Sequence, residues 1–224
     1  MPVIPVIDLK QGQVVHAVRG QREHYQPVAA MSRLCRSSEL RAVIEAFLTL
    51  HPFKYMYIAD LDAITGSGGH AELLARVLPE YPVEFWLDQG LCLSRTPRIV
   101  CDYYKTVLGT ESQQFAPAPA LSNFILSLDY NGPEALGRAD WFSDSRYWPR
   151  QVIAMNLSRV GGGGPDWELL RRLKVEHTDR ELIAAGGVRD DADLRRLENL
   201  GVWGVLAATG LHTGSIQSGV GLFL

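Results

Sequence analysis

Two segments of the chain carry the same succession of an apolar run, a glycine-rich loop and a helical pattern. Residues 57–74 read YIADLDAITGSGGHAELL, and residues 152–170 read VIAMNLSRVGGGGPDWELL. When Asp60 is aligned with Asn156, two glycines and the final Glu-Leu-Leu coincide. Strand–loop–helix units of this kind build parallel sheets covered by helices. The chain is therefore predicted to be an α/β protein that builds the same strand–loop–helix unit twice.

Short apolar runs alternate along the chain with segments of helical period. Runs that are apolar throughout fit strands buried on both faces, as a parallel sheet requires, and eight such strands can close a barrel. The predicted strands are Val3–Ile7, Tyr55–Ala59, Val83–Leu87, Thr106–Leu108, Phe124–Leu128, Val152–Met155, Leu182–Ala185 and Val202–Ala207. The predicted helices are Glu39–Leu50 with Ser37 and Ser38 as caps, His70–Leu78, Asp166–Leu173, and Asp190–Leu200 ending at Gly201.

The repeat extends beyond the first pair of segments. Asp88-Gln89-Gly90 aligns with Ala185-Gly186-Gly187, and Ile7-Asp8-Leu9 aligns with Leu128-Asp129-Tyr130. A half-barrel cannot bury both faces of its sheet alone, so the sequence predicts one (β/α)8 TIM barrel domain over residues 1–224, with half-barrels of roughly 1–122 and 123–224. The helices after strands 4 and 8 are expected to be degraded, because residues 110–122 contain APAPA and residues 214–224 are rich in glycine.

Composition narrows the kind of partner. The 224 residues are 46% hydrophobic and carry a net charge of -3, which gives no basic footprint for nucleic acid. Cys35, Cys92 and Cys101 form neither a CxxC pair nor a zinc pattern, and we expect reduced thiols. MPVIPVIDLK does not resemble a secretion signal, and no apolar run is long enough to span a membrane. A cytoplasmic protein that binds a small molecule or another protein is expected.

Two aspartates occupy matching positions in the halves. Asp8 follows the first predicted strand and Asp129 the fifth, and functional groups of such barrels gather at the C-terminal ends of the strands. Strands one and five lie opposite each other, so the carboxyl groups could flank one substrate as general acid and general base. The alternative is that each aspartate merely caps a loop.

Glycine-rich loops predict where an anion could bind. Gly186 and Gly187, followed by a helix start with free N–H groups, form the strongest phosphate candidate, and Ala208 and Thr209 would supply its other wall. The alternative is a simple tight turn. The equivalent position in the first half, beside Gly109 and Thr110, is doubtful because the Asp88 carboxylate would repel a phosphate unless it points away.

Two further loops could close over a ligand. Residues 158–164 combine Arg159, an anion-seeking group, with four glycines that include Gly162; the same loop could equally be a connector without a binding role. The long loop after Asp8 offers candidate lid residues, which could also be solvated surface groups: His16, Arg19, Arg22 and His24. The five tryptophans are expected to serve packing.

With these residues in place, the chain resembles the histidine-biosynthesis barrel family, which contains the phosphoribosylformimino-5-aminoimidazole carboxamide ribotide isomerase and its cyclase relative. The resemblance covers nearly the whole chain. Its motifs are IPVIDLKQGQVV at 4–15, DLD at 60–62, LGT at 108–110, SLD at 127–129, NLSRVGGGGPDWELL at 156–170 and IAAGGVRDDADL at 183–194. The family is itself known for half-barrel duplication.

The resemblance implies an activity. Asp8 and Asp129 fall where the isomerase keeps its catalytic aspartates, and the implied reaction is an Amadori rearrangement, an aldose-to-ketose isomerisation of a phosphorylated, aminated ribose. By family analogy Asp129 would protonate the ring oxygen and Asp8 would remove the proton from C2. No metal or organic cofactor is implied, because the protonated imine is the electron sink.

The chain departs from the family at three loops. Asp88-Gln89-Gly90 replaces a glycine triplet, MNLSRVG replaces TDISRDG, and Ala208-Thr209 replaces a glycine-arginine pair. Two alternatives to the histidine-pathway reaction therefore stay open: a paralogue acting on a smaller, singly phosphorylated substrate in another pathway, and a non-catalytic barrel that binds a phosphometabolite or a protein. The short eighth helix also suggests a homo-oligomer contact near Leu222-Phe223-Leu224.

Overall fold

A ring of eight parallel strands forms the centre of the molecule. The computed structural model describes residues 1–92, 102–116 and 123–217. The eight barrel strands are β1 (Val3–Lys10), β4 (Tyr55–Asp60), β5 (Glu84–Asp88), β6 (Lys105–Gly109), β7 (Phe124–Asn131), β9 (Gln151–Asn156), β10 (Glu181–Ala185) and β11 (Gly204–Ala207). Strand β11 pairs with β1 through Val3 and Val205, which closes the barrel. The predicted TIM barrel fold is confirmed.

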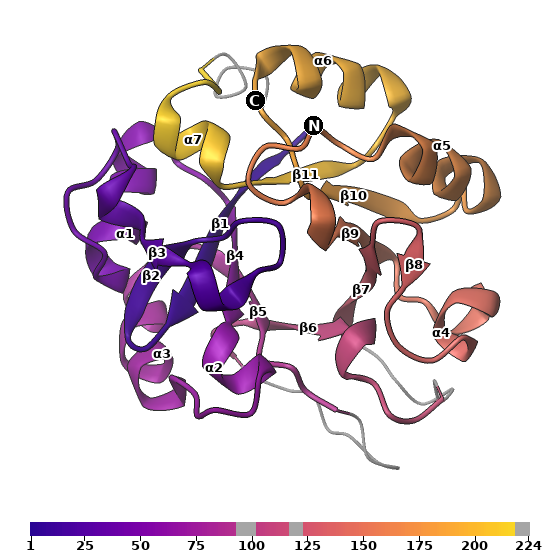
Figure 1. The fold of residues 1–224 in the computed structure, drawn as a ribbon, viewed down its shortest axis with the longest axis horizontal. Helices are drawn as coiled ribbons and strands as arrows, with labels where there is room; N and C mark the ends of the chain where they lie inside the picture. The colour runs from indigo at the N-terminus through magenta and orange to yellow at the C-terminus, as the bar shows by residue number, and fades with distance from the viewer. Residues whose placement is uncertain (93–101, 117–122, 218–224) are drawn as a thin grey trace.

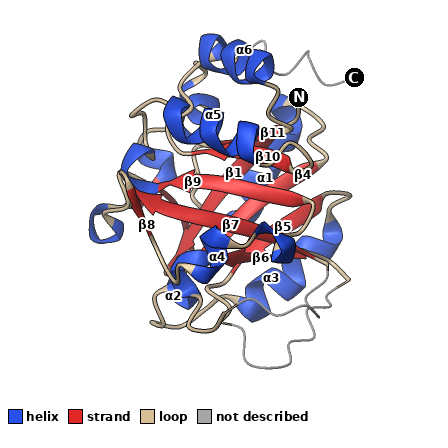
Figure 2. Cartoon of the chain, turned by 90° about the vertical axis from the view of Figure 1, so that its right-hand side faces the viewer, coloured by secondary structure: helices blue, strands red, loops and turns tan. Residues whose placement is uncertain are grey.

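Helices surround the strands, as Figures 1 and 2 show. The longer helices are α1 (Leu40–Leu50), α3 (Ala71–Val77), α5 (Trp167–Glu176) and α6 (Asp191–Leu200). Their apolar stripes pack on the outer face of the sheet; in α1 the buried residues are Leu40, Val43, Ile44 and Phe47. Short elements decorate the loops: α2 (Leu61–Ile64), α4 (Asp140–Ser143), α7 (Thr209–Thr213), the strands β2 (Gln13–His16), β3 (Gln26–Pro27) and β8 (Glu134–Ala135), and 3₁₀ turns.

The caps predicted for α6 are present, whereas the cap predicted for α1 is not. Asp190 caps α6 by accepting hydrogen bonds from the amides of Ala192 and Asp193, and Gly201 ends the helix in the left-handed conformation with φ of 77°. The predicted capping of α1 by Ser37 or Ser38 is wrong. Glu39 precedes that helix without a side-chain cap, and the Ser38 hydroxyl instead accepts a hydrogen bond from the Ala29 amide.

The helices predicted to be degraded are short. Strand β6 is followed by the 3₁₀ turn η4 (Thr110–Ser112), and β11 is followed by the five-residue α7. Residues 222–224, where an oligomer contact was predicted, lie outside the described residues, as does Cys101. Cys35 and Cys92 are free thiols.

The sheet separates two apolar layers because side chains alternate along each strand. Inside the barrel lie residues such as Ile4, Tyr57, Trp86 and Ile125. The intervening side chains, exemplified by Ile58 and Leu87, pack outward against the helices. This alternation decides which strand-end residues point into the barrel mouth.

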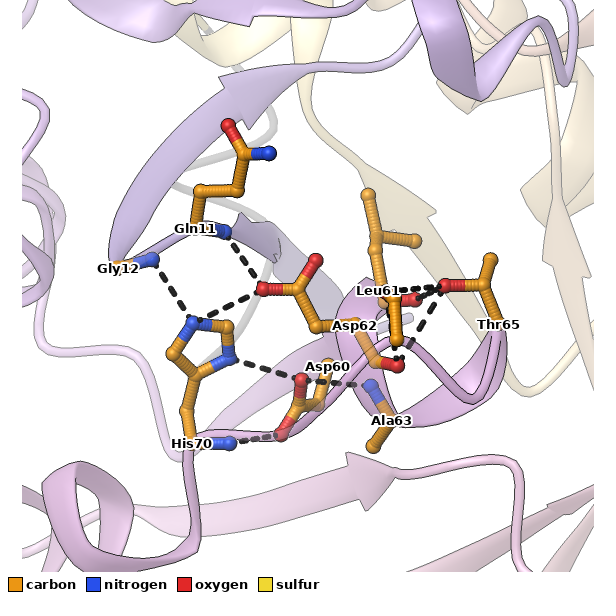
Figure 3. Close-up of polar contacts among 9 residues, drawn as sticks. Gln11, Gly12, Asp60, Leu61, Asp62, Ala63, Thr65 and His70 are labelled. Carbon is orange, nitrogen blue, oxygen red and sulfur yellow. Dashed lines mark hydrogen bonds and ion pairs between the residues drawn. The ribbon is translucent and has the colours of Figure 1, made fainter.

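The two halves repeat each other in detail. Asp60 at the end of β4 accepts hydrogen bonds from the Ala63 amide and from both the backbone and the ring of His70 (Figure 3). At the matching positions, Asn156 at the end of β9 accepts from the Ser158 amide and donates to Asp166. In both halves, a polar residue at the end of a strand is thus hydrogen-bonded to the residue that precedes the next of the longer helices. The pair is Asp60 and His70 in the first half, and Asn156 and Asp166 in the second.

Candidate active site

A cavity opens among the C-terminal ends of the barrel strands. One side of it is lined by ionisable and phenolic side chains: Asp8, Arg22, Tyr25, Tyr57, Asp88, Glu111 and Asp129. Another part is lined by small residues: Gly161, Gly162, Ala185, Gly186, Gly187, Ala207, Ala208 and Thr209. We call these the carboxylate end and the glycine end of the cavity. The mouth of a TIM barrel is where chemistry is usually located.

Asp129 is the most firmly held carboxyl group of the carboxylate end. It is 5% exposed, and it points inward because it shares the strand parity of Ile125 and Ser127 in β7. The Ser127 hydroxyl donates to Oδ1 at 2.6 Å, and the Glu111 amide donates to Oδ2 at 3.1 Å. Burial raises the pKa of Asp129 to about 8, against the lowering effect of the Ser127 hydrogen bond. This carboxyl group can therefore hold a proton at neutral pH.

Asp8 lines the same cavity from β1 and is partly exposed to it. It has the inward parity of Ile4 and Val6. Burial raises the pKa of Asp8 to about 7, and the positive charge of Arg22 opposes this rise. Burial thus raises the pKa of both Asp8 and Asp129 towards neutral pH, the range in which a carboxyl group can act as an acid or a base.

Asp88 is a third carboxyl group in the cavity. It ends β5 with the inward parity of Trp86 and is 6% exposed. Its Oδ2 accepts from the Tyr57 hydroxyl at 3.2 Å, and its Oδ1 accepts from the Gly90 amide at 3.0 Å. Burial raises its pKa to about 6. Asp88 lies two residues after Trp86, so the alternation of side chains along β5 was the sequence signal that could have added it to the predicted pair of Asp8 and Asp129.

Tyr57 lies among the three carboxyl groups. Its side chain belongs to the layer inside the barrel, and its hydroxyl group donates to Asp88. Burial raises its pKa well above the usual value, and the nearby charges of Asp88, Asp129 and Asp8 add to this. The phenol therefore stays neutral and acts as a hydrogen-bond donor.

An ion pair crosses the carboxylate end. Arg22, in the 3₁₀ turn η1 (Arg22–His24), donates to Glu111 of η4 at 2.5 Å. Both side chains are about a quarter exposed. The contact joins the loop after β1 to the loop after β6, which partly encloses the cavity. Loop conformation determines this contact, so neither residue's partner could be read from the sequence.

The glycine end is formed by backbone that cannot carry side chains. Gly187 has φ of 85°, and a Cβ there would lie 2.5 Å from the carbonyl oxygen of Gly164. Gly186 has φ of 91°, and a Cβ there would lie 2.5 Å from the carbonyl oxygen of Asn156. Glycine is thus required at both positions to bring the backbone to the cavity wall.

One expectation about the glycine end is wrong. The amides at the start of α6 were expected to be free for a phosphate, but Asp190 accepts hydrogen bonds from the Ala192 and Asp193 amides. The Arg189 amide donates to the Asp193 carboxylate. An anion would have to be bound by the loop itself and by the residues that follow β11.

The other predicted site residues are divided between the cavity and its surroundings. Ala208, Thr209 and Gly162 line the glycine end. Thr110 is fully buried behind Asp129, and its hydroxyl accepts from the Asp129 amide at 2.9 Å. Gly109 is adjacent, since a Cβ there would lie 2.9 Å from Oδ2 of Asp129.

Two arginines lie outside the lining. Arg159 borders a separate groove with Arg172, and Arg19 is exposed with φ of 50°. Of the candidate lid residues, only Arg22 lines the cavity; His16 contacts Thr209 at 3.0 Å, and His24 is exposed.

No metal site is evident in the ranges 1–92, 102–116 and 123–217, since no group of three or more His, Cys, Asp or Glu residues there could hold an ion. The helices of these same ranges are too short or too polar to span a lipid bilayer.

Fold and cavity together define a class: a (β/α)8 barrel whose mouth carries several carboxyl groups and a glycine-rich wall. Residues 145–217 match the family model described as histidine biosynthesis protein. Over this segment the chain is similar to the family that its motifs resemble.

Relatives match over nearly the full length. An uncharacterized protein of Methanocaldococcus jannaschii is 27% identical over 220 residues, covering 97% of this chain and 96% of the relative. A protein of an Arthrobacter species is 26% identical over 238 residues, covering 96% of this chain and 91% of the relative. One from Thermoanaerobacter pseudethanolicus is 24% identical over 238 residues, covering 97% and 96%. The last two are named 1-(5-phosphoribosyl)-5-((5-phosphoribosylamino)methylideneamino) imidazole-4-carboxamide isomerase.

Proposed function

We propose that the chain is an isomerase that converts a phosphorylated, aminated aldose into the corresponding aminoketose, with Asp129 as general acid and Asp8 as general base. The observation that carries this proposal is that the carboxyl groups of Asp8 and Asp129 line one cavity at the C-terminal ends of the barrel strands. The pKa of Asp129 is about 8 and that of Asp8 about 7. The isomerase names of full-length relatives support the reaction class.

The reaction can be written with all protons accounted for. Asp129 gives its proton to the ring oxygen, the bond from that oxygen to C1 breaks, and the nitrogen lone pair forms a protonated imine. Asp8 takes the proton from C2, and the C–H electrons form the C1–C2 double bond of an enolamine. Asp8 then returns a proton to C1 while the enol proton goes to Asp129, which leaves the aminoketose and restores both carboxyl groups.

The glycine end would hold the phosphate of the substrate. Gly186, Gly187, Ala208 and Thr209 bring backbone to the cavity wall without negative side chains, and Gly162 in the adjoining loop would close over the ligand. Thr110 and Gly109 are proposed to position Asp129 rather than to bind a second phosphate, because both lie against its carboxylate.

A second candidate is a paralogue that acts on a smaller, singly phosphorylated substrate. It is favoured by Asp88, which stands in the cavity where the half-barrel repeat provides Ala185. A substrate with two phosphates would bring the second one towards this carboxylate.

The test is a turnover screen with the purified protein. The histidine-pathway ribotide and smaller aminated sugar phosphates are offered to the wild type and to Asp8→Asn, Asp129→Asn and Asp179→Asn, the last being an exposed control. Loss of a general acid or base is expected to lower kcat by about 10²–10⁴-fold while ligand affinity changes little. An active wild type with unimpaired Asp8→Asn and Asp129→Asn variants would contradict the proposal. A wild type that binds these ligands without turnover would indicate a binding protein.

A further inference from the structure

The loops after β5 and β10 are alike at one glycine position but differ at the residue before it, where Gly186 has φ of 91° and Gln89 does not have a positive φ. Gly90 and Gly187 occupy matching positions, and both have positive φ, of 62° and 85°. A Cβ at Gly90 would lie 2.6 Å from Cα of Ile64, as one at Gly187 would lie 2.5 Å from backbone of Gly164. Each loop therefore turns back against the loop of the preceding strand in its half. The two loops therefore differ in the backbone at Gly186 and Gln89 and in the side chain at Asp88 and Ala185.

Asp88 is the side chain that changes the first loop. The matching residue in the second half is Ala185, whose methyl group lines the glycine end. Both residues are 6% exposed and face the cavity, so a carboxylate replaces a methyl group in an equivalent place. Its hydrogen bonds from Tyr57 and Gly90 fix this orientation.

Other negative groups surround Asp88. The Cβ position of Gly109 is 3.4 Å from Oδ2 of Asp88 and 2.9 Å from Oδ2 of Asp129, so both oxygens border the same point. Asp8 and Glu111 line the same cavity. Arg22 also lines this cavity, but its guanidinium group is already paired with Glu111. A phosphate entering this end would meet the ionised form of Asp88, whose pKa is about 6, within the cavity, where like charges repel.

We propose that Asp88 is a specificity-determining residue that excludes a second phosphate from the carboxylate end and selects a protonated amine there. The preferred ligand then has an anionic group at the glycine end and an amine at the carboxylate end. The proposal rests on the proposed function in taking this cavity as the substrate site. It also narrows the substrate class to singly phosphorylated amines.

An amine fits this end better than a hydroxyl group or a metal ion. An ammonium group has three donors and no acceptor, and ionised carboxylates are acceptors only, so each contact is charge-assisted. A hydroxyl group has a single O–H donor and no positive charge, so it would make one hydrogen bond to a carboxylate without the attraction between opposite charges. Among the described residues, these carboxylates do not form a group with metal-site geometry.

Binding to the wild-type protein tests the proposal without any variant. Titration calorimetry compares ω-aminoalkyl phosphates of two to six carbons with alkyl phosphates and alkanediyl bisphosphates of the same lengths, and with inorganic phosphate. The best aminoalkyl phosphate is expected to bind at least about tenfold more tightly than its alkyl and bisphosphate counterparts, as one close charge pair can provide. Equal or tighter binding of the bisphosphate, or no binding of any probe, would overturn the proposal.

The Asp88→Asn variant tests whether Asp88 causes the preference for an amine. The amide keeps the size of the side chain and removes its charge; its oxygen can still accept from Gly90, while its NH2 group would donate to the Tyr57 hydroxyl instead of accepting from it. The advantage of the amine is expected to fall below about threefold, and bisphosphate binding is expected to improve. Glu23→Gln, an exposed neighbour of Arg22, is the control that should keep the wild-type ratio. An unchanged ratio in Asp88→Asn would refute the role of Asp88.

This outcome is separate from that of the isomerase proposal. If the amine is preferred but no aminated sugar phosphate is turned over, the isomerase proposal fails and the specificity assignment stands. If the histidine-pathway ribotide is turned over and bisphosphates bind best, the isomerase proposal stands and the specificity assignment fails.

Discussion

The two ends of the cavity come from matching loops of a duplicated half-barrel, yet they differ in almost every chemical respect. The loop after β10 presents Gly186 and Gly187, while the loop after β5 presents Asp88. One glycine position is shared, since Gly90 and Gly187 both have positive φ and close backbone contacts, but Gly186 has φ of 91° where Gln89 does not have a positive φ. The two loops thus share one glycine turn, and the residues beside it differ in what they could bind.

The largest expected effect is at the glycine end. Gly187→Ala would place a methyl group 2.5 Å from the carbonyl oxygen of Gly164 at a φ of 85°. Relative to Gly132→Ala, whose φ of 62° is similar but whose surroundings are open, we expect an additional loss of about 2–4 kcal/mol in the free energy of unfolding. Thermal unfolding of both variants measures it. Equal melting temperatures would show that the loop is not held as described.

The next expected effect is the pH dependence of kcat/KM, which tests the roles proposed for Asp8 and Asp129 at the carboxylate end. Because the pKa of Asp8 is about 7 and that of Asp129 about 8, kcat/KM should peak between these values. It should fall about tenfold per pH unit below and above them. In Asp88→Asn the alkaline limb should move to lower pH, since the Asp88 charge contributes to the raised pKa of Asp129. A flat profile from pH 6 to 9, or an alkaline limb that moves upward, would contradict the assignment.

The smallest effect concerns stability. The pKa of Asp88 is about 6 in the folded chain and 3.8 as the unperturbed value, so its protonated form favours folding and this contribution is lost as the pH rises through 6. Asp88→Asn should therefore stabilise the protein at pH 8 by about 1 kcal/mol, or a melting temperature about 2–4 °C higher, and less at pH 4. The exposed Asp179→Asn serves as the control. If the variant were less stable at pH 8 than at pH 4, relative to wild type, the expected direction of this effect would be wrong.

The sequence predicted the barrel because its signals are local. Eight apolar runs, the glycines that end helices and the repeat of residues 57–74 in 152–170 all reflect short-range rules. The start of α1 was mispredicted because Ser38 is used by the Ala29 amide of a neighbouring loop, a contact that no local pattern reveals.

The site was only partly predictable, and strand parity explains why. Asp8, Asp88 and Asp129 share the parity of the inner side chains of their strands, whereas Asp60 follows Ala59 of the inner layer and points outward to His70. Applying this alternation would have added Asp88 to the predicted pair. The contact between Arg22 and Glu111 joins residues 89 positions apart through two loops, and it could not be predicted from spacing.

The most direct test of the asymmetric cavity is the position of an anion in crystals of the protein soaked in phosphate. We expect phosphate density beside Gly186, Gly187 and Thr209, and none beside Gly109 and Thr110. Density at both places with similar occupancy, or only beside Gly109, would contradict the asymmetry of the two ends.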